Sequence, residues 1–189
     1  MAANLDKARE TLLAELREHA LVIGEVTLSS GQTAEYYVDA KRALLRPAAF
    51  RAVGTLLADR AEEWSAGAVG GMTMGADPLA CAAIAAERGA DLVGFFVRKE
   101  RKAHGLHRWI EGPELAPGTH CMVVEDVVTT GGSTVAAVER IREEGLEIGG
   151  VVAVVDRLAG GGEAISSAAD APYRALVTID DLYPERPDR

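Results

Sequence analysis

The sequence predicts an α/β fold with a mainly parallel sheet of about five strands flanked by helices. Short apolar runs rich in β-branched residues alternate with segments of helical spacing along most of the chain, a pattern typical of βαβ units. Of the 189 residues, 48% are hydrophobic and 26% charged, enough for one substantial core. We therefore expect a single domain over residues 1–189, with a small N-terminal hood at about residues 20–40.

The N-terminal part of the chain contains a helix, a hairpin and a second helix. Apolar side chains between residues 4 and 20 recur at helical spacing, and Asn4 is a candidate N-cap. Residues 22–28 and 35–38 enclose the turn-rich segment SSGQTA and predict the short hairpin of the hood. Pro47 stands at the tolerated first position of the next helix, which we expect to end near Trp64.

The rest of the chain supplies a Rossmann-like sheet. Compact apolar runs predict buried strands over residues 67–71, 92–97, 121–124, 148–155 and 173–179. Helices are expected between them, over residues 78–88, over residues 133–144 and directly after residues 160–162. Gly145 is a natural C-cap for the second of these helices.

Composition excludes several classes of partner. The net charge of −9 disfavours nucleic acid and anionic membrane surfaces. Cys81 and Cys121 both stand in apolar runs, so we expect buried thiols in a reducing cytoplasm and no disulfide. No apolar run approaches the length of a membrane span, and the acidic, helical N-terminus is no signal peptide. We expect a cytoplasmic protein.

The stretch VVEDVVTTGGST, residues 123–134, is the most informative part of the sequence. An apolar strand ends in the adjacent acids Glu125 and Asp126, and a Thr/Gly-rich turn leads into a helix at Ser133 and Thr134. Ligands of open α/β sheets bind at this end of a strand, and a helix N-terminus attracts phosphate. An anion site beside acceptors for sugar hydroxyls would suit a ribose 5-phosphate as ligand. An ordinary turn with a capped helix is the simpler alternative, but this pattern is narrower.

Other nucleotide motifs are missing from the sequence. It contains neither G-x-x-x-x-G-K-[ST] nor G-x-G-x-x-G at this stretch, which argues against a P-loop nucleotidase and a dinucleotide-binding fold. The loop MTMGADP, residues 72–78, follows another predicted strand and is rich in small residues. We expect it to form a second anion site, for pyrophosphate, beside residues 123–134.

The stretch RKERKAHGLHR, residues 98–108, is strongly basic in an acidic chain. It contains a single acid, Glu100, against five basic residues: Arg98, Lys99, Arg101, Lys102 and Arg108. A solvated surface loop or a nucleic-acid patch would also explain the charge. The position directly after a core strand, together with Gly105 beside His104, favours a mobile loop that closes over a polyanionic leaving group. His104 is therefore a better candidate than His107.

Two of these stretches resemble a known family. VVEDVVTTGGST resembles the phosphoribosyl-pyrophosphate (PRPP) binding motif of type I phosphoribosyltransferases. The pattern R-K-x-x-K-x-H-G resembles the catalytic loop of orotate phosphoribosyltransferases, and its matching residues are Arg98, Lys99, Lys102, His104 and Gly105. Resemblance in pattern extends over about residues 24–181, and the two motifs together are specific.

The resemblance implies an activity and a set of site residues. The activity is transfer of ribose 5-phosphate from PRPP to orotate, which gives orotidine 5′-phosphate and pyrophosphate in pyrimidine biosynthesis. The catalytic residues implied are Lys102, His104 and Asp126. The PRPP-binding residues implied are Arg98, Lys99, Lys102, His104, Glu125, Asp126, Val127, Val128, Thr129, Thr130, Gly131, Gly132 and Ser133. Thr129 and Arg157 would bind orotate, because an arginine fork matches a planar carboxylate.

The resemblance also implies a cofactor and a partner. Mg²⁺ would be held mainly by PRPP and water, with no direct protein ligand. A homodimer is implied, in which the catalytic loop reaches the neighbouring subunit's site. The chain departs from the family pattern at Thr73-Met74-Gly75 and at Ser29, where many members have lysine. Pyrophosphate would then depend more on Arg98, Lys99, Lys102 and backbone donors.

Two other functions remain open at this point. A phosphoribosyltransferase with a purine or uracil acceptor would have no use for the Arg157 fork, because its acceptor base is neutral. A non-enzymatic regulator that keeps the PRPP site as a sensor would need an added DNA-binding element or a lost catalytic loop, and the sequence shows neither change.

Overall fold

The computed structural model describes residues 2–27, 33–101 and 108–189. The described chain contains a main sheet of six strands in the order β5-β4-β3-β6-β7-β8. The bounds of these strands are Ala68–Met72 (β3), Val93–Val97 (β4), Ile110–Glu111 (β5), His120–Val128 (β6), Glu147–Asp156 (β7) and Tyr173–Thr178 (β8). All neighbours pair in parallel except β4 and β5, which are antiparallel. The predicted mainly parallel α/β fold is confirmed, and the additional strand β5 is too short to show a periodic pattern.

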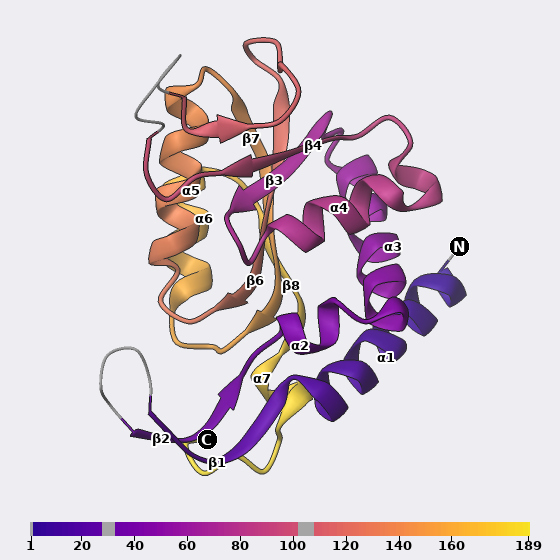
Figure 1. The fold of residues 1–189 in the computed structure, drawn as a ribbon, viewed down its shortest axis with the longest axis vertical. Helices are drawn as coiled ribbons and strands as arrows, with labels where there is room; N and C mark the ends of the chain where they lie inside the picture. The colour runs from indigo at the N-terminus through magenta and orange to yellow at the C-terminus, as the bar shows by residue number, and fades with distance from the viewer. Residues whose placement is uncertain (1, 28–32, 102–107) are drawn as a thin grey trace.

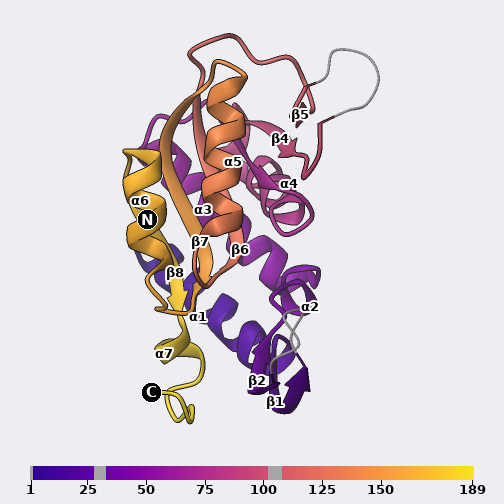
Figure 2. The same cartoon turned by 90° about the vertical axis from the view of Figure 1, so that its left-hand side faces the viewer.

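Helices cover both faces of the main sheet (Figures 1 and 2). On one face lie α5 (Gly132–Glu143) and α6 (Gly161–Ala169), which pack in a core with Val123 and Val151. On the other face lie α1 (Ala2–His19), α3 (Pro47–Glu63) and α4 (Asp77–Ala85), whose core includes Val124 and Val152. Neighbouring strand residues therefore face opposite cores, as expected for a strand buried on both sides.

The predicted hairpin is present outside the main sheet. Strands β1 (Leu21–Thr27) and β2 (Thr33–Val38) pair antiparallel in a sheet of their own. In Figure 1 this hairpin lies below the main sheet, and Tyr36 of β2 contacts Arg157, which follows β7. A four-residue helix, α2 (Lys41–Leu44), connects it to α3. The hairpin is thereby placed at the carboxyl ends of the parallel strands.

Several local predictions are confirmed and others are wrong. Helix α5 ends at the predicted point, since Gly145 has φ +80° and the Leu146 N–H donates to Ile141 O, as in a Schellman cap. Asn4 does not cap α1, because the helix already begins at Ala2. The helix expected over residues 78–88 is divided, because α4 ends at Ala85 and a 3₁₀ turn, Glu87–Gly89, follows.

The thiols and the C-terminal segment add further corrections. Cys121 is buried as predicted, but Cys81 is exposed, because it lies on the outer side of α4. Both are free. Helix α7 (Ile179–Leu182), which was not predicted, begins with a capping box formed by Thr178 and Asp181. Within the described residues, no helix has the length and apolarity that crossing a membrane requires.

Candidate active site

The two predicted acids lie near the carboxyl end of β6, and both are buried. Glu125 is 5% exposed and Asp126 is 8% exposed. Glu125 Oε2 accepts a hydrogen bond from the Thr134 hydroxyl at 3.0 Å, and Asp126 Oδ1 accepts one from the Val127 N–H at 2.9 Å. Burial, and then the charge of Asp126, raise the pKa of Glu125 to about 7. The pair therefore forms a fixed, acidic end to the strand.

The loop after β3 packs directly against this acid pair. A Cβ at Gly75 would lie 2.6 Å from Asp126 Oδ1 and 3.0 Å from Glu125 Oε1, so a side chain cannot fit there. The neighbouring Met74 is 72% exposed, and the Thr73 hydroxyl donates to Asp77 at 2.6 Å. The predicted second anion loop and the stretch of residues 123–134 are thus adjacent in space, as the parallel sheet requires.

The turn after β6 leaves its polar groups available to a ligand. Four of its residues are exposed: Thr129, Thr130, Gly132 and Ser133. Gly131 has φ +83° as the N-cap of α5, and no side chain caps this helix. The backbone N–H groups of its first turn therefore remain available, together with the positive end of the helix dipole. This is the arrangement expected of a phosphate cradle.

Two residues of the stretch 123–134 are buried and have a structural role. The Thr134 hydroxyl is buried and donates to Glu125, so it does not face the ligand side of the turn. The side chain of Val128 is 1% exposed and packs in the core, so it can offer only backbone atoms. Val127 is half-buried beside Asp126.

The turn of residues 129–133 is called the phosphate turn from here on. A second glycine turn packs against it. At the start of α6, a Cβ on Gly161 would lie 2.5 Å from Thr129 O and 2.9 Å from Gly131 N. A Cβ on Gly131 would in turn lie 2.9 Å from Gly161 O. The two backbones therefore approach each other more closely than any side chain would allow. The sequence shows three glycines at residues 160–162, but nothing in it indicates this contact.

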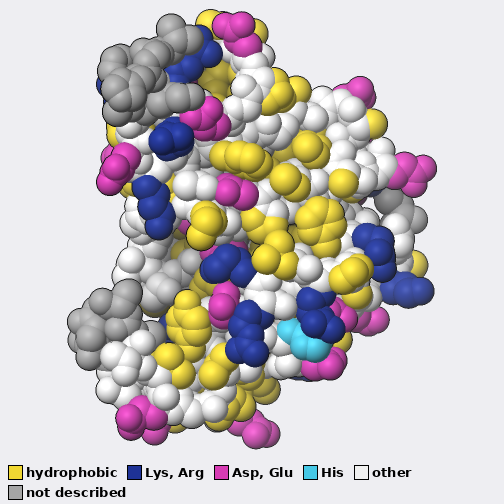
Figure 3. Space-filling view, in the orientation of Figure 1, with side chains coloured by type: hydrophobic (Ala, Val, Ile, Leu, Met, Phe, Trp, Pro, Cys, Tyr) yellow, Lys and Arg dark blue, Asp and Glu magenta, His cyan; other side chains and the backbone are white. Residues whose placement is uncertain are grey.

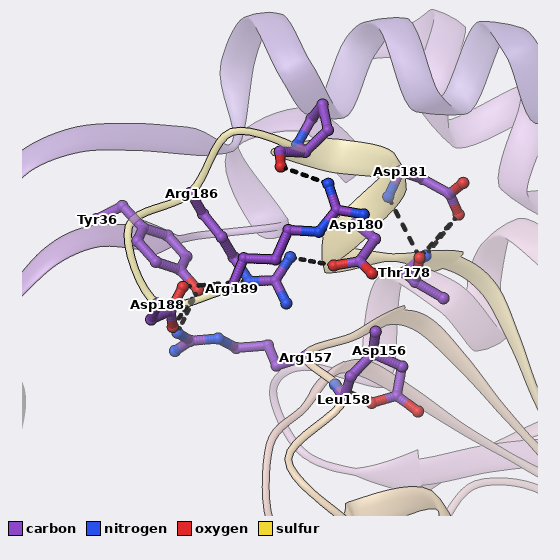
Figure 4. Close-up of polar contacts among 11 residues, drawn as sticks. Tyr36, Asp156, Arg157, Leu158, Thr178, Asp180, Asp181, Arg186, Asp188 and Arg189 are labelled. Carbon is purple, nitrogen blue, oxygen red and sulfur yellow. Dashed lines mark hydrogen bonds and ion pairs between the residues drawn. The ribbon is translucent and has the colours of Figure 1, made fainter.

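Arg157 follows β7 and lies beside the end of β6. Its N–H donates to Val128 O at 2.8 Å, which places it next to Thr129 as expected. Its guanidinium lies 5.0 Å from the ring centroid of Tyr36 in the hairpin and donates to the Tyr36 hydroxyl at 3.0 Å. That hydroxyl donates in turn to Asp188 at 2.9 Å (Figure 4). Hairpin, C-terminal segment and β7 thus meet around one arginine.

Asp156 does not pair with its neighbour Arg157. Its carboxylate, 7% exposed, accepts hydrogen bonds from the Tyr173 hydroxyl at 2.9 Å and from the Leu158 N–H at 2.7 Å. Burial, and then the bond to Asp156, raise the pKa of Tyr173. These bonds engage the Asp156 carboxylate with Leu158 and Tyr173, and the Arg157 guanidinium faces the hairpin instead.

The described beginning of the basic stretch follows β4, on the opposite side of β6 from Arg157. Arg98 and Lys99 line a cavity of 340 Å³ together with Thr73 of the loop after β3. Arg98 donates to Glu111 at 3.0 Å, and Lys99 is exposed. Lys102 and His104, the predicted catalytic residues of this stretch, lie outside the described residues, as do Gly105 and Ser29.

Sequence reasoning missed a cluster at the base of the basic stretch. Arg140 of α5 donates to Arg98 O at 3.0 Å and lies 4.5 Å from the centroid of Trp109. The Trp109 indole donates to Glu143 at 2.8 Å, and Arg101 pairs with the same carboxylate. The helix that begins at the phosphate turn therefore also anchors Arg98 and Arg101 of the basic stretch, and Trp109 directly after it.

Sequence reasoning also missed Lys41. Its ammonium lies 3.0 Å from Asp126 Oδ2 and 3.5 Å from Asp39 Oδ1. Partial burial alone would lower the pKa of Lys41, but the hydrogen bond and charge of Asp126 outweigh it, so the pKa is raised. In the orientation of Figure 1, the surface is hollowed between the main sheet and the hairpin, with charged side chains beside the hollow (Figure 3).

No metal cage is apparent in the part of the chain that the structure describes. It contains no group of three or more His, Cys, Asp or Glu side chains arranged to hold a metal ion. The acid pair nevertheless offers carboxylate oxygens, the ligand type that Mg²⁺ prefers. The residues present therefore fit a hydrated Mg²⁺ that a phosphate-rich substrate brings with it.

Comparison with known proteins identifies the family. Residues 41–170 match the phosphoribosyl transferase domain. The chain is 49% identical over 176 residues to orotate phosphoribosyltransferase of Corynebacterium glutamicum, covering 93% of this chain and 94% of that protein. It is 48% identical over 180 residues to the Streptomyces avermitilis orotate phosphoribosyltransferase, covering 94% and 98%.

Solved structures agree with the sequence relatives. The crystal structure of the Mycobacterium tuberculosis orotate phosphoribosyltransferase with Fe(III) dicitrate has a TM-score of 0.84 at 43% identity, over 93% of this chain and 99% of that one. The same enzyme in complex with PRPP has a TM-score of 0.79 at 39% identity, over 93% and 98%. This chain therefore belongs to the orotate phosphoribosyltransferase family.

Proposed function

We propose that this chain is an enzyme that transfers ribose 5-phosphate from PRPP to orotate, with release of pyrophosphate, in pyrimidine biosynthesis. The observation that supports this best is the convergence of three features at one edge of the sheet. These are the buried acid pair of β6, the uncapped N-terminus of α5, and Arg157 beside Thr129. They suit, in that order, a ribose, a 5′-phosphate and a planar carboxylate.

The reaction breaks the bond from the anomeric carbon to pyrophosphate oxygen and forms a bond from that carbon to a ring nitrogen of orotate. Positive charge develops on the sugar during this exchange, so the sugar must be held rigidly. Glu125 and Asp126 would accept hydrogen bonds from the ribose hydroxyls. The exposed residues of the turn, Thr129 to Ser133, would hold the 5′-phosphate through backbone N–H groups and hydroxyls.

The leaving pyrophosphate needs positive charge around it. Arg98 and Lys99 lie beside the loop after β3, where the pyrophosphate is expected. Lys102 and His104 are proposed from the sequence pattern to act on the leaving group, one of them as a proton donor. Mg²⁺, held mainly by PRPP oxygens and water, would neutralise part of the leaving group's charge.

Selection of orotate over other bases is assigned to Arg157 and Thr129. A guanidinium donates two parallel hydrogen bonds to a carboxylate, and a site built for that pairing rejects an acceptor that lacks it. Uracil and hypoxanthine carry no carboxylate, so they would leave Arg157 without its partner. This proposal separates the chain from phosphoribosyltransferases with neutral acceptors.

The assembly and location of the protein remain proposals. A homodimer in which the catalytic loop serves the neighbouring subunit is proposed from the family resemblance. A cytoplasmic enzyme is supported by the two free thiols, Cys81 and Cys121, neither of which forms a disulfide.

A substrate panel with purified protein tests the proposal. With PRPP and Mg²⁺ present, the loss of orotate's ultraviolet absorbance should follow enzyme concentration, and chelation of Mg²⁺ should stop it. Uracil and hypoxanthine should give rates lower by about two orders of magnitude or more. Equal turnover of either neutral base would show that the acceptor has been assigned wrongly.

A further inference from the structure

We infer that Lys41 is a positioning residue for PRPP, because its ammonium fixes the carboxylate of Asp126. The inference rests on the proposed function. In the described part of the chain, Lys41 is the basic residue that forms an ion pair with the acid pair, at 3.0 Å from Asp126 Oδ2. The partner carboxylate is nearly buried, with a side chain 11% exposed, whereas that of Lys41 is 41% exposed. The pair therefore lies at the boundary between the core and the ligand side.

The two oxygens of Asp126 are held by different groups. Oδ1 accepts from the Val127 N–H at 2.9 Å, and Oδ2 accepts from the Lys41 ammonium at 3.0 Å. Together these bonds fix the plane of the carboxylate. A fixed plane is needed if the carboxylate is to accept hydrogen bonds from two adjacent ribose hydroxyls. Glu125 has its own support in Thr134. Without Lys41, one oxygen of Asp126 would lose its fixed donor.

Charge gives Lys41 a second effect on the same carboxylate. Glu125 and Asp126 are adjacent and buried, and their mutual repulsion contributes to the raised pKa of Glu125. A nearly buried carboxylate is costly unless a cation compensates it. The Lys41 ammonium supplies that compensation, and it adds positive charge beside a substrate that carries several negative charges.

Lys41 also connects the hairpin to the main sheet. It is the first residue of α2, and only Asp39 and Ala40 separate it from the hairpin strand β2. Its ammonium lies 3.5 Å from Asp39 Oδ1, a buried atom that accepts no hydrogen bond within the described structure. The same ammonium therefore compensates one carboxylate from the hairpin side and one from β6. It couples the position of the hairpin to the orientation of Asp126.

Matched variants test this inference. Lys41→Met removes the charge and keeps the length of the side chain, Lys41→Arg keeps the charge, and Arg42→Met removes an exposed neighbouring charge. Calorimetric titration with PRPP and Mg²⁺, without orotate, measures binding directly. We expect Lys41→Met to weaken PRPP binding by about tenfold or more, Lys41→Arg by less than about threefold, and Arg42→Met by less than about twofold.

Steady-state kinetics and melting temperature separate positioning from general damage. The KM for PRPP should rise in Lys41→Met, while the KM for orotate and the melting temperature stay close to the parent values. In an Asp126→Asn background the Lys41→Met effect should shrink to about twofold or less, because the carboxylate that it fixes is gone. A Lys41→Met effect of unchanged size in that background would overturn the inference.

The remaining outcomes are also decisive. If Lys41→Met binds PRPP as the parent does, or if it melts early and loses both substrates equally, Lys41 has no positioning role. If the parent binds PRPP but does not consume orotate, the proposed function fails while the calorimetric comparison still decides the role of Lys41.

Discussion

At the scale of single residues, Arg157 is held by contacts of both its backbone and its side chain. Its own N–H donates to Val128 O, and the N–H of the next residue, Leu158, donates to the Asp156 carboxylate. Its guanidinium stacks on Tyr36 and donates one hydrogen bond to that hydroxyl. A guanidinium has five donors, so most of them remain for a ligand carboxylate.

Replacement of Arg157 by alanine should damage orotate binding selectively. We expect the KM for orotate to rise by about 30-fold to 100-fold, the effect of losing a charge-assisted bidentate pair. PRPP affinity by calorimetry should change by less than about twofold. Arg174→Ala, which removes an exposed arginine from β8, is the matched control. A comparable loss of PRPP affinity in Arg157→Ala would place this arginine at a different part of the substrate.

Glu125 makes stability depend on pH. Its folded-state pKa of about 7 lies above the ordinary value of 4.5 because the carboxyl is buried beside Asp126. Between these two values the folded chain binds more protons than the unfolded chain, so stability should fall as pH rises through this window. Denaturant unfolding should give a free energy lower by roughly 2 kcal/mol at about pH 8 than at about pH 5.

Glu125→Gln is the control for this pH effect. Glutamine can still accept the Thr134 hydroxyl bond but does not titrate, so this component of the pH dependence should disappear. If the variant and the parent lose stability equally between about pH 5 and about pH 8, the dependence comes from another group.

At the scale of elements, the site depends on how closely two turns approach each other. The turn before α5 and the turn before α6 touch through backbone atoms, and glycine at position 161 permits the contact. The phosphate turn is therefore supported by a second turn that is not among the predicted ligand-binding residues. The acid pair is similarly enclosed by Gly75 of the loop after β3.

Gly161→Ala should disturb the phosphate turn, although residue 161 is not part of that turn. The added Cβ would meet Thr129 O at 2.5 Å and Gly131 N at 2.9 Å, and backbone atoms cannot give way cheaply. We expect a loss of about 1–3 kcal/mol in the free energy of unfolding and weaker PRPP binding. Gly149→Ala is the control, because its Cβ would meet its nearest neighbour at 3.6 Å. Unchanged PRPP affinity in Gly161→Ala would show that the two turns are independent.

At the scale of the whole molecule, the alternation of apolar runs and helical segments was sufficient to predict a mainly parallel sheet with helices on both faces. The strand of His120–Val128 and the turn after it were predictable because their apolar run, acids and glycines follow one another in the chain. Contacts between distant segments were not predictable in this way. Lys41 with Asp126, Tyr36 with Arg157, and Gly161 with Thr129 each join residues with no common local pattern.

Errors in the sequence interpretation have similar physical causes. Cys81 stands in an apolar run, yet it is exposed, because a helix with apolar residues on most sides still turns one face outward. Thr134 belongs to the ligand-like stretch, yet helical geometry turns its hydroxyl back onto Glu125. The extent of the domain over all 189 residues stays a proposal, as do the roles of Lys102 and His104.

One crystal structure would test the central claim most directly, namely that of this protein with orotidine 5′-phosphate. This single ligand contains the phosphate, the ribose and the carboxylate. We expect the phosphate on the N–H groups at the start of α5, the ribose hydroxyls on Glu125 and Asp126, and the carboxylate on Arg157. A phosphate bound elsewhere, or a carboxylate that faces solvent away from Arg157, would contradict the assignment of the site.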